Sequence, residues 1–176
     1  MVNDKALEKL SYGLYLISTR WEGRSAGCIV NTLTQATASP ARVTVTINKE
    51  NETTRLLQQS GVFTATVLSQ EASLGLIGRF GFRSSRDFDK FAGWRTAVGK
   101  NGVPYVDEQM VARFECRVVG QMDADTHIVF LAELLEGELI GDGEPMSYAY
   151  YHQVKKGRTP PQAPSYIRQQ ESDSSC

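Results

Sequence analysis

Polar and apolar residues alternate along several short stretches of the chain, which is the pattern of β-strands with one buried face. The clearest case is RVTVTINK at 42–49, where Val43, Val45 and Ile47 share one face. Further strands are expected at 13–21, 25–31, 62–68, 112–122 and 127–140. Turn residues at 22–24 and 123–125 predict that the first two and the last two of these stretches form hairpins.

Three stretches predict short helices instead. The first spans 3–10, the second spans 51–61 and is closed by Gly61, and the third is capped by Ser69 and stopped by Gly81. The segment SYAYYHQV at 147–154 is interpreted as a tyrosine-rich strand. Because strands dominate and the helices are too few to cover both faces of a parallel sheet, we expect a mainly β fold, a closed antiparallel barrel of at least six strands.

Composition narrows the class of protein. The chain has 19 Lys and Arg against 20 Asp and Glu, so no charge surplus favours nucleic acid or an anionic membrane surface. No stretch reaches the roughly 18–20 apolar residues of a membrane span, and the charged N-terminus is unlike a secretory signal. We expect a cytoplasmic protein with one domain over 1–154 and a polar tail over 155–176.

Neither a disulfide framework nor a metal site is expected. Three cysteines, Cys28, Cys116 and Cys176, lie far apart in the sequence and form no C-x-x-C pair. His127 and His152 are the only histidines, and neither has a metal-ligand spacing to neighbouring carboxylates.

The segment NTLTQAT at 31–37 is the strongest candidate binding element. In an extended chain Asn31, Leu33 and Gln35 face one way, and Thr32 and Thr34 face the other. Backbone amides, hydroxyls and carboxamides along one edge match what the polar rim of a flavin ring requires. The alternative is an exposed edge strand in which threonine serves only as a strand former.

A second candidate, NKENETT at 48–54, joins a strand to a helix. Asn48, Lys49 and Thr53 lie where the first N–H groups of the helix are unpaired, which favours a bound phosphate. Ordinary helix capping by Asn51 or Thr53 is the alternative.

The third candidate is FRSSRDFDKFAGW at 82–94, a long insertion without sustained periodicity. It combines cations and hydroxyls, which bind phosphate oxygens, with aromatic rings, which can flank a ring system. Its cations are Arg83, Arg86 and Lys90, and Ser84 supplies one of the hydroxyls. A solvated basic loop is the alternative. Motifs of dinucleotide-binding Rossmann folds, P-loop NTPases, serine hydrolases and zinc proteases are absent from the sequence.

Taken in order, four segments resemble the flavin reductase-like family of FMN-binding split barrels, especially flavoredoxin-type proteins and flavin domains fused to rubredoxin. They are 25–35 (SAGCIVNTLTQ), 45–68, 80–91 (FGFRSSRDFDKF) and 145–166, and they span most of the chain. The resemblance implies a homodimeric, Greek-key split barrel with FMN near the dimer interface. It also implies that residues 31–35 line the ring, that Asn48, Lys49 and Thr53 surround the phosphate, and that Ser84, Arg86 and Lys90 close on the flavin.

The resemblance further implies an NAD(P)H-dependent oxidoreductase that moves electrons from NADH, NADPH or a redox partner through FMN to a flavin or an electron-transfer protein such as rubredoxin. No protein acid or base is required, so no catalytic residue is assigned. Tyr151 and His152 are candidates for gating the open face of the flavin. Two alternatives are a non-enzymatic FMN electron carrier and a barrel that binds haem or another flavin-sized ligand.

Overall fold

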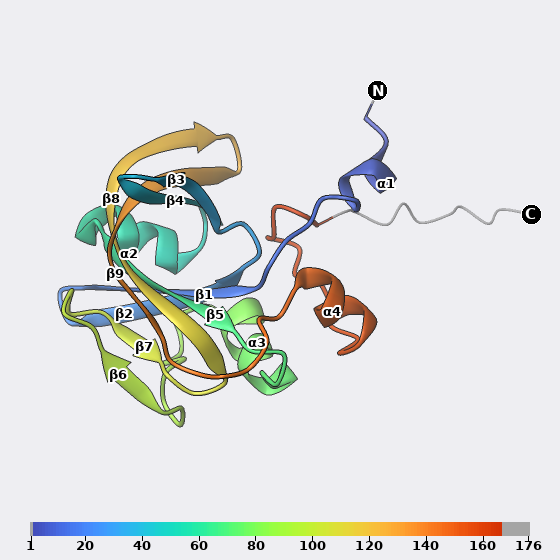
Figure 1. The fold of residues 1–176 in the computed structure, drawn as a ribbon. Helices are drawn as coiled ribbons and strands as arrows, with labels where there is room; N and C mark the ends of the chain where they lie inside the picture. The colour runs from blue at the N-terminus through green and yellow to red at the C-terminus, as the bar shows by residue number, and fades with distance from the viewer. Residues whose placement is uncertain (1, 167–176) are drawn as a thin grey trace, which may run out of the picture.

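The computed structural model describes residues 2–166, which form one curved β-sheet flanked by short helices (Figure 1). The first half of the chain contains α1 (Asp4–Leu7), β1 (Tyr15–Trp21), β2 (Arg24–Val30), β3 (Thr34–Ala38), β4 (Ala41–Asn48), α2 (Glu52–Ser60) and β5 (Val62–Leu68). The second half contains α3 (Leu74–Phe82), β6 (Thr96–Val98), β7 (Pro104–Val106), β8 (Met110–Ala124), β9 (His127–Leu139) and α4 (Tyr148–Gln153).

Seven strands form one antiparallel sheet in the order β2-β1-β5-β8-β9-β4-β3. The mainly β, antiparallel fold is therefore confirmed, and so are both predicted hairpins. The first turn places Glu22 and Gly23 at positive φ, and the second does the same with Asp125. At the end of β2, the Thr32 hydroxyl donates to the Thr46 carbonyl at 2.7 Å and so ties this segment to β4. The sheet curls around so that β3 and β4 lie over the other strands (Figure 1).

The two faces of the sheet bury separate apolar clusters. Neighbouring residues of a strand point to opposite faces, and Ile17 lies in one cluster while Leu16 lies in the other. The Ile17 cluster draws on β1, β2, β4, β5, β8, β9 and α2, and the Leu16 cluster packs under α3 and α4. These clusters fix the ends of β2 and β4 relative to α3 and α4.

Three predictions about local structure were wrong. The third helix begins at Leu74 and is capped by Ser73, whose Oγ accepts from Leu76 N at 3.1 Å, whereas Ser69 precedes it in a turn. Residues 148–153 form α4 rather than a strand, because the Ser147 side chain caps them through Tyr150 N at 3.0 Å. Gly81 does not stop α3, which continues to Phe82.

The insertion at 82–102 leads into the hairpin β6–β7, which the sequence pattern did not indicate. The buried carboxylate of Glu115 holds its turn by accepting from the backbone N–H groups of Lys100 and Asn101 at 3.0 and 2.9 Å. Of the polar tail predicted over 155–176, only residues 155–166 are among the described residues. Up to Tyr166, this segment runs from the end of α4 to the ends of β2 and β4, where Ser165 and Gln162 contact Asn31 and Asn48.

Candidate functional site

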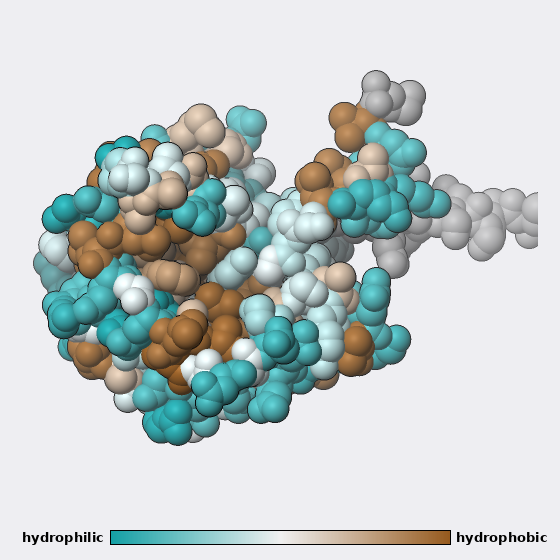
Figure 2. Space-filling view, in the orientation of Figure 1, coloured by the Kyte–Doolittle hydropathy of each residue, from teal (hydrophilic) through white to brown (hydrophobic). Residues whose placement is uncertain are grey.

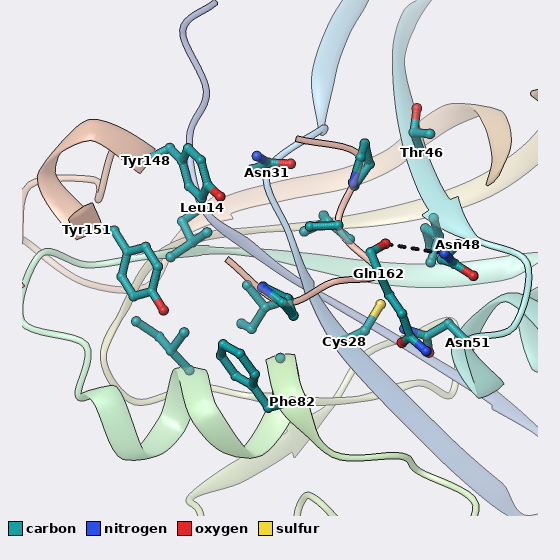
Figure 3. A pocket seen from close by; sticks show the side chains of 18 of the residues that line it. Leu14, Cys28, Asn31, Thr46, Asn48, Asn51, Phe82, Tyr148, Tyr151 and Gln162 are labelled. Carbon is teal, nitrogen blue, oxygen red and sulfur yellow. Dashed lines mark hydrogen bonds between the residues drawn. The ribbon is translucent and has the colours of Figure 1, made fainter. Parts of the chain in front are cut away.

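A cleft lies between the ends of β2 and β4, the start of α2, the end of α3, and α4. Figure 3 shows Tyr148, Tyr151 and Phe82 on one side of it and Thr46, Asn48 and Asn51 on the other. Residues 158–164 of the C-terminal segment run between these two sides. The lining is predominantly apolar with a few amide and hydroxyl groups, which is the usual make-up of a site for a small organic ligand.

Asn31 directly follows β2, lines the cleft and is 5% exposed. Its Nδ2 donates to Ser165 Oγ at 2.7 Å. Its Oδ1 is buried and has no hydrogen-bond partner within residues 2–166. A buried amide oxygen without a donor is costly, so this atom is suited to receive an N–H from a ligand.

Asn48 ends β4 on the opposite side. Its Oδ1 accepts from Glu50 N at 2.9 Å, which fixes the orientation of the carboxamide. Its Nδ2 points to the Gln162 carbonyl at 3.4 Å (Figure 3). Asn51 follows as the N-cap of α2 and also lines the cleft, with its Oδ1 accepting from Thr53 N at 3.0 Å.

A polar extension continues from the cleft past Asn51 and Phe82, which line both parts, to the insertion residues Ser84 and Arg86. Here Glu52 is buried and binds three arginines, with Arg24, Arg55 and Arg86 at 3.2, 2.6 and 3.1 Å. The hydrogen bond from Arg55 lowers the pKa of Glu52 to about 2, with Arg86 acting in the same direction. The cluster itself has three guanidinium groups against one carboxylate, while Glu50 and Asp87 also line the extension.

The structure places Lys90 differently from the sequence expectation. Lys90 is 2% exposed and does not line the cleft; its Nζ donates to the carbonyls of Gly27 and Phe80 at 2.7 and 3.1 Å. Burial lowers its pKa from 10.5 to about 8. Lys90 lies under the floor of the cleft, because Gly27 precedes the lining residue Cys28 and Phe80 precedes Gly81. Burial also raises the pKa of the Cys28 thiol, against the opposing charge of Lys90.

The remaining predicted residues are dispersed around this site. The Thr32 hydroxyl bonds to β4, Leu33 is buried in the core, and Thr53 is fully buried in the first turn of α2. Thr34 and Gln35 lie on the exposed strand β3, and the Lys49 ammonium pairs with Asp123 at 2.6 Å. None of these residues belongs to the set of described residues that line the cleft or its extension.

Tyr151 lines the cleft, whereas His152, the next residue of α4, is not among the lining residues. The Tyr151 hydroxyl donates to the Arg158 carbonyl at 2.9 Å and accepts from Arg158 N at 3.1 Å. His152 contacts the Gly157 carbonyl through Nδ1 at 2.9 Å and Thr159 Oγ1 through Nε2 at 3.2 Å. Both residues therefore hold the start of the C-terminal segment.

No group of three or more candidate metal ligands occurs among the described residues, and no helix among them is long and apolar enough to cross a bilayer.

Residues 7–157 match the family model described as the flavin reductase like domain. The chain belongs to the flavin reductase-like family. Its activity class is that of an oxidoreductase that works through a flavin.

Two curated members of the family are similar along most of the chain. A ferric-chelate reductase (NAD(P)H) from Archaeoglobus fulgidus is 43% identical over 163 residues, covering 93% of this chain and 96% of that protein. A high molecular weight rubredoxin from Moorella thermoacetica is 41% identical over 172 residues, covering 98% of this chain and 75% of that protein. Among solved structures, the NADH:FAD oxidoreductase of Streptomyces globisporus shares the fold, with a TM-score of 0.73 at 20% identity over 82% of this chain and 86% of the other.

In this flavin reductase-like chain, several lining residues were not predicted from the sequence. Tyr148 and Phe82 line the cleft from α4 and α3, and Gln162 lines it from the tail. The spacing of Tyr148 and Tyr151 is that of two residues on one helix face, a signal that was available in the sequence. Gln162 had no such signal, because its place in the cleft depends on the path of the whole C-terminal segment.

Proposed function

We propose that the cleft holds the flavin as FMN, with the isoalloxazine ring near Asn31 and Asn48 and the phosphate toward Ser84 and Arg86. The observation that carries this proposal is the buried, unpartnered Oδ1 of Asn31. A flavin ring offers an N–H between two carbonyl oxygens, so a carboxamide can both accept from it and donate to it. Asn31 therefore fits the group, and the apolar side chains of Leu14, Ile29 and Phe82 fit the rest of the ring.

FMN is proposed rather than FAD because the arginine side chains near the cleft form a single cluster. Arg24, Arg55 and Arg86 converge on Glu52 beside the polar extension, which suits one phosphate group. The sequence contains no dinucleotide-binding glycine motif. Release of the bound flavin by acid and its chromatographic identification should yield FMN, and recovery of mostly FAD would contradict the assignment.

The bound flavin would supply the redox chemistry, and the protein would orient it and exclude water. Asn31 and Asn48 would fix the polar rim of the ring through their carboxamides. Tyr148, Tyr151 and Phe82 would form the apolar side of the cleft. Lys90 would act at a distance, since its ammonium lies beneath the floor and is bound to backbone carbonyls.

We propose that a reduced nicotinamide donates the electrons and that a ferric chelate is one acceptor. This rests on the identity to the Archaeoglobus fulgidus reductase along nearly the whole chain. Mixing the FMN-loaded protein with NADH or NADPH without oxygen should bleach the flavin absorbance in a stopped-flow instrument. Addition of a ferric chelate should restore the absorbance, whereas a flavin that neither nicotinamide reduces would contradict the proposal.

A second candidate is an electron carrier that works with a redox protein. The identity to the Moorella thermoacetica protein, whose name includes rubredoxin, favours it. A carrier should exchange electrons with reduced rubredoxin faster than with either nicotinamide. Comparison of the two rates on one preparation separates the candidates.

We also propose that the curved sheet closes as a split barrel and that two copies of the chain associate. Apolar side chains are exposed on the N-terminal segment around α1, where Val2, Leu7 and Leu10 are 74%, 47% and 56% exposed. Figure 2 shows this apolar surface on the part of the chain that projects from the body. A projecting apolar segment of this kind fits a second copy.

A further inference from the structure

The C-terminal segment Thr159–Ser165, which we call the strap, lies along the cleft, with Pro161, Gln162 and Pro164 also exposed to solvent. Pro160, Gln162, Ala163 and Pro164 are among the lining residues. In Figure 3 Gln162 lies between the tyrosine side and the asparagine side. The strap thus forms one wall of the space that the proposed function gives to the flavin.

Oxygen atoms of the strap accept hydrogen bonds from the same side chains that would hold the ring. The Gln162 carbonyl accepts from Asn48 Nδ2 at 3.4 Å, and Ser165 Oγ accepts from Asn31 Nδ2 at 2.7 Å. A flavin ring presents carbonyl oxygens to such donors. Each carboxamide N–H engaged by the strap is therefore unavailable to a ligand in this arrangement.

The root of the strap, Gly157 and Arg158, is fixed against Tyr151 of α4. Gly157 packs so closely on the Tyr151 ring that an added Cβ would lie 2.0 Å from it. The Tyr151 hydroxyl holds both backbone polar groups of Arg158. Beyond this point the strap is held by polar contacts rather than by apolar packing: Thr159 Oγ1 contacts the Tyr148 hydroxyl and His152 Nε2, and Ser165 Oγ donates to the Tyr148 hydroxyl at 3.3 Å. Such hydrogen bonds contribute little net free energy, because release of the strap exchanges them for hydrogen bonds to water.

Resting on the proposed function, we propose that the strap is a tethered competitor that engages the carboxamide donors of Asn31 and Asn48 and is displaced from them when FMN binds. Its root at 157–158 stays in place and the residues beyond it move out. Flavin affinity is then set partly by how strongly the strap is held. The strap competes within the same molecule, so its effect does not depend on protein concentration.

One anchor of the strap lies outside the cleft and can be removed without altering the lining. His127 Nε2 contacts the Gln162 carbonyl at 3.1 Å, and His127 is not a lining residue. His127→Ala in the full chain should raise the affinity for FMN by roughly 2- to 10-fold, the value of one hydrogen bond. Thr126→Val is the matched control, because it removes the other partner of the ring, Thr126 Oγ1 on Nδ1, and leaves the strap contact.

Fluorescence titration of FMN against the parent and both variants measures these affinities. Hydrogen–deuterium exchange of the full chain, with and without saturating FMN, reports the strap directly. The amides of Ala163 and Tyr166, which donate to the carbonyls of Pro160 and Ala163 at 3.0 Å each, should exchange faster in the presence of FMN.

The outcomes separate the two proposals. If the parent binds FMN tightly but exchange in the strap becomes slower or stays unchanged, the competitor proposal is wrong and the flavin site stands. The same conclusion follows if the affinity of His127→Ala for FMN is unchanged or weaker. Absence of FMN binding by the parent and by His127→Ala overturns both.

Discussion

Glu52 is a buried carboxylate that holds three arginines from β2, α2 and the insertion together. Because its pKa in the folded protein is about 2, below the ordinary value of 4.5, its stabilising effect is complete above pH 4.5 and is lost as the pH falls toward 2. Glu52→Gln should therefore lower the free energy of unfolding by about 2 kcal/mol at neutral pH.

Urea titration at several pH values tests this, with the exposed neighbour Glu50→Gln as the control. The gap between parent and Glu52→Gln should shrink as the pH falls from 4.5 toward 2. A gap that is constant over this range would mean that the charge of Glu52 contributes nothing.

Lys90 is a buried cation, and its pKa of about 8 is depressed from 10.5 by burial. Below pH 8 it is charged in both the folded and the unfolded chain. Between pH 8 and 10.5 the unfolded chain binds more protons, so this group makes the folded state more stable as the pH rises. Lys90→Met keeps the packing of the stem but leaves the carbonyls of Gly27 and Phe80 without a donor, at a cost of about 1–3 kcal/mol.

Unfolding free energies of the parent and Lys90→Met at about pH 7 and about pH 10 provide the test. The variant should be less stable at both, and the difference should widen at the higher pH. Equal stabilities would place Lys90 in solvent, in agreement with the alternative interpretation of this segment as a solvated basic loop.

Residue types indicated the chemistry of the cleft better than its geometry. Asn31 and Asn48 were identified from the sequence because strand ends carrying carboxamides are recognisable. Lys90 was identified for its charge, but one of its two carbonyl partners, Gly27 in β2, lies 63 residues away in the sequence, and the other, Phe80, lies in α3. Thr34 and Gln35 were grouped with Asn31 by proximity in the chain, and the turn into β3 carries them away from the cleft.

At the scale of elements, α3 carries Ile77, Gly81 and Phe82 into the cleft, and Ser73 determines where it begins. Ser73→Ala should lower the free energy of unfolding by about 1 kcal/mol, the usual value of an N-cap. Ser73→Asp, which retains a capping oxygen, should be close to the parent. Urea denaturation of the three proteins measures the effect. If Ser73→Ala is as stable as the parent, the Ser73 side chain does not stabilise the start of α3.

Strand positions were predictable because period-2 alternation and turn residues agree with the final pairing along β1, β2, β4, β5, β8 and β9. The helix α4 was not, since tyrosines favour strands and the capping by Ser147 competes with that preference. The hairpin β6–β7 was missed because its strands have three residues each, and Glu115 on a distant strand stabilises its turn.

For the whole molecule, the exposed apolar residues of the N-terminal segment predict association of two chains. Sedimentation should give about twice the 19.5 kDa of one chain. Replacing Leu7 and Leu10 together by Glu should shift the protein toward a monomer, whereas Val98→Glu on the exposed hairpin should not. A parent that sediments as a monomer would contradict the prediction.

The central claim is that the cleft at the ends of β2 and β4 holds FMN through the carboxamide of Asn31. The most direct test is the dissociation constant of FMN for the parent, for Asn31→Leu, which keeps the side-chain volume but removes its polar atoms, and for the exposed control Gln35→Ala. Asn31→Leu should weaken binding about tenfold or more, and Gln35→Ala should bind like the parent. Equal affinities for the parent and Asn31→Leu would show that the flavin is not bound through Asn31.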